Sequence, residues 1–192
     1  MPILGIIASQ VPGRLPSGSY ESIQTVTVGS GGTSTITFSS IPQTYKHLQL
    51  RSVARDASSG NDTNSFKIVI NSDTSSTYSR QGIGGDTQNN TYSFREYYTG
   101  FGYAGNIARN GTMSNLFGAS VITFFDYSST DKYKNFMFFS GATFNGEAPA
   151  NIGAMSGMYT STNAISSISF TSSQNANFLQ NSQFALYGIK GE

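Results

Sequence analysis

The chain has 192 residues, with eleven Lys and Arg against ten Asp and Glu, a formal charge of +1 and no cysteine. Only 11% of its residues are charged, less than half of the roughly 25% found in typical soluble domains. This near-neutral balance argues against electrostatic binding of nucleic acid or of an anionic membrane. The lack of cysteine excludes disulfides, thiolate nucleophiles and cysteine-ligated metal sites.

Residues 1–18 are predicted to form an extended docking arm. They hold three of the five prolines, whose missing N–H disfavours helix and sheet. The alternative is a flexible tail, but aliphatic side chains are costly to leave in water. Those expected to dock on a neighbouring subunit or partner are Ile3, Leu4, Ile6, Ile7, Val11 and Leu15.

The same apolar opening could be mistaken for an export signal. It has no basic segment before it, and Pro2 and Gly5 interrupt it. No other stretch approaches the roughly 18 apolar residues of a membrane span. We therefore expect a soluble product made inside the cell.

From Tyr20 onward the pattern has period two, which predicts β-strands. Ile36 and Phe38 alternate with threonines, and Gly29–Gly32 before them is predicted to close a hairpin with residues 24–28. Further strands are predicted at residues 48–54, 66–70, 92–98, 117–125, 133–140, 151–159, 165–171 and 183–189. The glycine-rich stretch from Gly82 to Gly118 is the least regular, and outside the strand predicted at residues 92–98 much of it is expected to form long loops at one end of the sandwich.

No amphipathic helical stripe is present, so helix should be minor. About ten strands without helical crossovers favour antiparallel pairing. We therefore predict an all-β fold for residues 19–192, a single antiparallel β-sandwich of jelly-roll-like topology preceded by the extended N-terminal arm.

Chemistry-bearing residues are sparse. The single His47 lacks an evident nucleophile or further ligands nearby in sequence, and is expected to be structural. The ten carboxylates are scattered, and no pair, such as Glu96 with Glu147, is favoured for glycoside hydrolysis. Asp56 and Asp62 bracket a loop that resembles a calcium loop only weakly, and turn-capping is the simpler role. We expect no catalytic residue, no metal and no cofactor.

Aromatic side chains gather in the glycine-rich stretch. Tyrosine beside Ser, Gly and Asn is typical of adaptable binding loops, and aromatic rings stack on sugars as well as bases. The alternative is that these rings fill the core or a subunit interface. The candidate surface-recognition residues are Tyr92, Tyr97, Tyr98, Phe101 and Tyr103.

Three segments together carry a family resemblance: MPILGIIAS at the start, SYESI through VGSGG to IPQTYKHLQLR, and SQFALYGIKG at the end. In this joint order they resemble a group of virion structural proteins of tailed bacteriophages, common among marine and cyanobacterial phages. The resemblance covers roughly the first 55 and last ten residues. It implies particle assembly rather than catalysis, and it supplies no active-site residues.

The leading hypothesis is a capsid decoration (cement) protein on the particle exterior, assembled in the host cytoplasm. It would form a homo-oligomer, a trimer by preference, and contact the major capsid protein through the arm. The first alternative is a tail-fibre or baseplate component that contacts tail proteins and host glycans. The second is a polysaccharide depolymerase. The first two predict neither nucleic-acid nor membrane binding.

Overall fold

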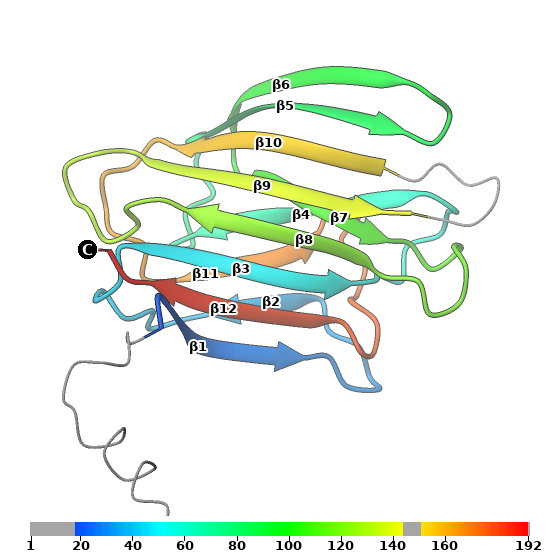
Figure 1. Ribbon diagram of the computed structural model, residues 1–192, viewed down its shortest axis with the longest axis horizontal. Coiled ribbons are helices and arrows are strands. Elements are labelled where there is room, and N and C mark those ends of the chain that lie inside the picture. The colour runs from blue at the N-terminus through cyan, green and yellow to red at the C-terminus, as the bar shows by residue number, and fades with distance from the viewer. Residues whose placement is uncertain (1–17, 144–150, 192) are drawn as a thin grey trace, which may run out of the picture.

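The computed structural model describes residues 18–143 and 151–191, which form twelve antiparallel strands and no helix. The strands are β1 (Tyr20–Thr27), β2 (Thr35–Phe38), β3 (His47–Ala54), β4 (Thr63–Ile70), β5 (Tyr78–Asp86), β6 (Thr91–Thr99), β7 (Gly102–Ala108), β8 (Gly118–Phe124), β9 (Lys134–Ala142), β10 (Asn151–Tyr159), β11 (Ile168–Ser172) and β12 (Gln183–Ile189). They build an eight-stranded sheet in the order β1-β12-β3-β8-β9-β10-β5-β6 and a four-stranded sheet in the order β2-β11-β4-β7. In Figure 1 the smaller sheet lies behind the larger one.

The strand order confirms the predicted β-sandwich of jelly-roll type. Without β5, β6, β9 and β10, the two sheets read β1-β12-β3-β8 and β2-β11-β4-β7. These are the two four-stranded sheets of a jelly roll, in which successive strands cross from one sheet to the other except at β4 and β7, which pair within the smaller sheet. The remaining strands are two inserted hairpins, β5–β6 after β4 and β9–β10 after β8.

The two hairpins meet each other and widen the larger sheet. β9 pairs with the jelly-roll strand β8, and β10 pairs with β5 along its whole length, from Asn151↔Asp86 to Tyr159↔Tyr78. We call β9, β10, β5 and β6 the sheet extension. Strand β7 of the smaller sheet packs beneath β8, β9 and β10, so the extension continues beyond the edge of the smaller sheet (Figure 1).

Period-two alternation explains why these segments form half-buried strands. In β2, Ile36 and Phe38 are buried between exposed threonines, as predicted. In β9, Phe136 and Phe138 face the interior, whereas Met137 and Phe139 face outward. The centre of the core is Phe66 of β4, whose ring lies 5.6–6.2 Å from the rings of Phe170, Phe178 and Phe184.

A glycine lets β7 pass close to that ring. Gly105 has φ +67° and forms a β-bulge opposite Ser65 and Phe66. A Cβ at this position would lie 2.7 Å from the Phe66 ring and 2.6 Å from Ser120 Oγ. Only glycine fits both the backbone angle and the space.

Two local predictions are wrong. Gly29–Gly32 does not join two strands of a hairpin, because β1 pairs with β12 in one sheet and β2 pairs with β11 in the other. The segment is a turn that crosses between sheets, closed by a hydrogen bond from Gly32 N–H to Gly29 O at 3.1 Å. The stretch Gly82–Gly118 is also not mostly loop, since it contains most of β5 and all of β6 and β7.

Candidate functional site

The outer face of the larger sheet, which points away from the smaller sheet, exposes a band of apolar side chains. The strand register places them in rows across β8, β9, β10 and β5. One row is Val121, Phe139, Ala154 and Ile83; the next is Ala119, Gly141, Ile152 and Gly85; the third is Thr123, Met137, Ser156 and Gln81. Phe139 and Ile83 are 60% and 65% exposed, although both are large hydrophobic residues. We call these three rows the outer apolar band.

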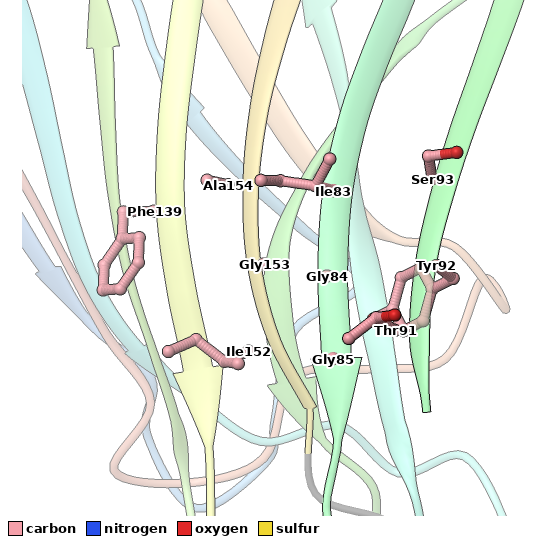
Figure 2. Close-up of a pocket in the computed structure, with 10 residues that line it drawn as sticks. All are labelled: Ile83, Gly84, Gly85, Thr91, Tyr92, Ser93, Phe139, Ile152, Gly153 and Ala154. Carbon is pink, nitrogen blue, oxygen red and sulfur yellow. The ribbon is translucent and has the colours of Figure 1, made fainter. Parts of the chain in front are cut away.

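Small residues make a hollow in this band. Ala154 lies between the larger side chains of Phe139 and Ile83, and with the neighbouring Gly153 and Gly85 it leaves an open groove of about 650 Å³. Figure 2 shows Phe139 on β9, Ile152 and Ala154 on β10, and Ile83 on β5 around this groove. The groove therefore exists because glycine and alanine residues on adjacent strands leave space beside larger side chains.

Two further hollows adjoin the first. One, of about 720 Å³, shares Ile83, Ser93 and Ala154 with it and extends to Met137 and Arg95. The other, of about 690 Å³, lies over β3, β8 and β12 and shares Phe139 with the first. Phe139 thus stands as a ridge between two depressions of one continuous face.

The outer apolar band has no charged position, as its three rows contain only apolar, small and uncharged polar residues. The nearest charged side chains in the same strand register are Arg51, opposite Val121, and Arg95, opposite Gln81. Arg51 lies over the rings of Tyr20 and Tyr187, at 5.3 and 5.0 Å from their centroids. Such a face can cover another protein surface without desolvating charge.

The predicted docking residues Ile3, Leu4, Ile6, Ile7, Val11 and Leu15 lie outside the described residues. Docking of the arm stays a prediction.

The predicted recognition residues lie in strands or in a short connection rather than in long loops. Tyr92 and Tyr97 are on β6, 40% and 59% exposed, and Tyr103 is on β7. Phe101 joins these strands, and its ring meets that of Tyr103 edge-on at 4.9 Å. Tyr98 belongs to β6, and its side chain is not described. The recognition role itself stays a prediction.

Aromatic rings on β6 cover the glycines of β5, which explains why a glycine-rich segment pairs as a strand. Tyr92 lies opposite Gly84, and a Cβ on Gly84 would come within 2.5–2.6 Å of that ring. Phe94 lies opposite Gly82 in the same way. Cross-strand aromatics of this kind restore the packing that a strand glycine lacks.

Arg80 lies between the ring of Phe94 and the ring of Tyr103 on the inner face of the sheet extension. Its guanidinium lies 4.9 Å from the Phe94 ring centroid and 4.2 Å from that of Tyr103, and its Nε donates to Glu96 at 2.8 Å. A polar cleft of about 250 Å³ lies beside it. The other polar or aromatic side chains that line this cleft are Thr63, Ser65, Tyr92, Phe94, Asn106, Phe138 and Asn151.

The remaining sequence candidates are held by structural contacts. His47 Nδ1 accepts a hydrogen bond from the Asp126 N–H at 3.0 Å, and its ring packs on Phe125. Asp56 is buried and accepts hydrogen bonds from Ser58, Asn64 and Ser172, whereas Asp62 pairs with Arg109. Asp56 and Asp62 therefore bind different partners. Glu147 lies outside the described residues, so its relation to Glu96 is not described.

Asp126 is the most strongly perturbed carboxylate near these residues. Hydrogen bonds from Lys132 and Lys46 lower its pKa from 3.8 to about 2. The two ion pairs measure 2.7 and 2.9 Å and both lysines are more than half exposed. Asp126 and Lys132 lie between β8 and β9, whereas Lys46 precedes β3, so the two ion pairs fix this connection and hold it to the start of β3.

Sequence reasoning missed the outer apolar band. Residues 136–139 read Phe-Met-Phe-Phe, which makes β9 apolar on both faces. In a strand that is buried on one face alone, apolar and polar residues alternate. A strand that is covered on both faces has a continuous run of apolar residues. That run was the available signal that the outward face of β9 is suited to contact another surface.

Within the described residues, no three His, Asp or Glu side chains gather where they could hold a metal ion. The same residues include no helix long and apolar enough to cross a membrane. In comparisons with known proteins, no protein-family model matches the chain, and neither a curated protein nor a solved structure is significantly similar to it.

Proposed function

We propose that the protein is a structural component of a tailed-bacteriophage particle, most specifically a decoration (cement) protein of the capsid exterior. It assembles in the host cytoplasm, forms a homo-oligomer and contacts the major capsid protein. Its role is binding and assembly without catalysis. The trimeric ring expected from the sequence remains part of this proposal.

The outer apolar band is the observation that supports the proposal most directly. Phe139, Ile83 and Ile152 are more than half exposed on one face, and burying each such side chain is worth about 1.5–3 kcal/mol. Apolar patches of this kind mark interaction surfaces. The jelly roll is a fold that viral capsid proteins use, and lectin domains also use it, so the fold alone does not choose between these functions.

Particle binding tests this proposal. Particles of the encoding phage that lack the protein would be mixed with the full chain or with a variant lacking residues 1–12. We expect the full chain to co-sediment with particles, and the variant to keep its circular dichroism spectrum but lose binding. Undiminished binding of the variant would refute docking through the arm. Images of decorated particles with density on the tail alone would refute the capsid location.

The polar cleft beside Arg80 favours a second candidate, a tail-fibre or baseplate component that binds host glycans. A charged pair, amide side chains and the exposed ring of Tyr92 offer hydrogen bonds and a stacking surface for a sugar ring. A glycan array tests it. Binding that is lost in Tyr92→Ala and kept in Tyr133→Ala, a control at an exposed tyrosine elsewhere, would support this candidate. An array without hits and labelling confined to the head would remove it.

A further inference from the structure

We propose that two copies of the chain pair face to face through the outer apolar band, with Phe139 of each copy seated in a hollow of the other. The partner is a second copy in an isologous, two-fold arrangement. This inference adds a two-fold contact to the proposed homo-oligomer, through which two trimeric rings would pair, and it rests on that part of the proposed function.

The relief of the face is self-complementary. Phe139 projects between the hollow over β10 and β5, drawn in Figure 2, and the hollow over β3 and β8. A two-fold axis that passes between a ridge and an adjacent hollow brings each ridge over the hollow of the other copy. Because Phe139 on β9 lies directly opposite Ala154 on β10, an axis that runs between these two strands satisfies this condition.

The outer apolar band itself carries no charge that would attract an oppositely charged partner. The outer apolar band is uncharged, and the flanking charges in register with it, Arg51 and Arg95, are both positive. Two identical charged faces would repel, whereas two uncharged faces do not. Apolar burial therefore supplies the attraction, without the cost of burying unpaired charge.

The outer face around the band also has the size that such a pair needs. With the axis between β9 and β10, six of the eight strands of one copy overlap the other copy, from β3 to β6. Six strands at about 4.8 Å and seven residues at about 3.3 Å cover roughly 29 by 23 Å. The projected area is about 650 Å² per partner, or about 1,300 Å² in total, above the roughly 1,000 Å² expected of a specific interface. Packed sheets lie about 10 Å apart with interdigitating side chains, and Phe139, Ile83, Met137 and Ile152 are large enough to fill that space.

The mass of the full chain in solution gives the first test. Sedimentation analysis of the 20.5 kDa chain over a range of concentrations should show an even number of copies. We expect Phe139→Glu to weaken association roughly 10- to 100-fold, since the buried ring is lost. Tyr133→Glu changes a comparably exposed aromatic residue outside the band and should leave association unchanged. Phe139→Ser serves as a milder variant if the glutamate impairs folding.

Cross-linking gives the second test, and the cysteine-free chain makes it clean. Ser156→Cys places one thiol on the outward face of β10, and Thr35→Cys places one on β2 as a control. With a short bis-maleimide, Ser156→Cys should cross-link to its own counterpart far more than Thr35→Cys does.

Three outcomes would overturn the pairing. They are a chain that stays monomeric at high concentration, equal cross-linking of the two cysteine variants, and a partner mapped to residues 1–17 when a photo-cross-linker replaces Ile83. None of them affects particle binding by the arm, which is measured separately. The failure of this inference is therefore distinguishable from the failure of the proposed function.

Discussion

The jelly roll and the sheet extension differ in strand length and in how they place their side chains. The four strands of the extension have nine residues each, whereas the jelly-roll strands have four to eight. In the jelly roll, every strand but β1 buries one face in the common core, as β4 does with Phe66, Ile68 and Ile70. In the extension, β9 is apolar on both faces, and β5 carries glycines at Gly82, Gly84 and Gly85. The difference indicates that the jelly roll provides stability, whereas the extension presents a surface.

The largest expected contrast is between two phenylalanines. Phe66→Ala removes a fully buried ring that three other aromatic rings surround, and should lower the free energy of unfolding by about 3–5 kcal/mol. Phe139→Ala should change it by no more than about 0.5 kcal/mol at concentrations where the chain is monomeric. Urea denaturation of both variants measures this, and equal losses would abolish the distinction between the two regions.

The buried guanidinium of Arg55 provides the next test, in the jelly roll. The Arg55 guanidinium donates to the backbone carbonyls of Asn110, Thr112, Met113 and Leu116 at 2.5–3.3 Å. Arg55→Met leaves these oxygens without that donor, and should cost at least about 1.5–3 kcal/mol. Hydrogen exchange should increase in residues 109–117 before it increases in β5 or β6. Hydrogen exchange that increases first in the sheet extension would contradict the role of Arg55 in stabilising the jelly roll.

A glycine substitution tests the extension by itself. A Cβ at Gly82 would lie 2.9 Å from both the Ala154 carbonyl oxygen and the Phe94 ring. Gly82→Ala should therefore destabilise the β5–β6 hairpin by about 1–3 kcal/mol. Exchange should rise in β5, β6 and β10 while β3, β4 and β12 stay protected. Gly153→Ala is the matched control, since its nearest atom lies at 3.7 Å.

The smallest expected effect concerns pH. Because hydrogen bonds from Lys132 and Lys46 lower the pKa of Asp126 to about 2 in the folded chain, its carboxylate contributes stability above the unfolded pKa near 4. That contribution falls away as the pH drops from about 4 to about 2. The lysines are exposed, so it should not exceed about 1 kcal/mol. Asp126→Asn should flatten this part of a stability–pH curve, and salt should do the same to the unsubstituted chain.

The sequence predicted strands best where alternation was regular. The expected segments at residues 151–159 and 183–189 match β10 and β12 end to end. β5 and β7 were missed because Gly82, Gly84 and Gly105 look like loop residues until the rings beside them are placed. Which strands pair with β1 and β2 depends on contacts between segments that are far apart in the sequence. The residues around Gly29–Gly32 alone therefore could not show that this turn crosses between sheets and does not close a hairpin.

The candidate surface was harder to predict than the fold. Its residues come from β8, β9, β10 and β5, and become neighbours only through the strand register. The aromatic residues between Tyr92 and Tyr103 attracted attention because they are close in sequence. Much of their apolar surface instead packs on glycines and on Arg80.

The pairing of β5 with β10 has a consequence for how the molecule folds and changes. Tyr78 pairs with Tyr159, so the extension closes through contacts of high contact order, which form slowly. Until both hairpins are in place, each leaves an open strand edge that invites aggregation. Deleting either hairpin alone should therefore promote aggregation more than deleting both hairpins. We expect the two insertions to be gained or lost together.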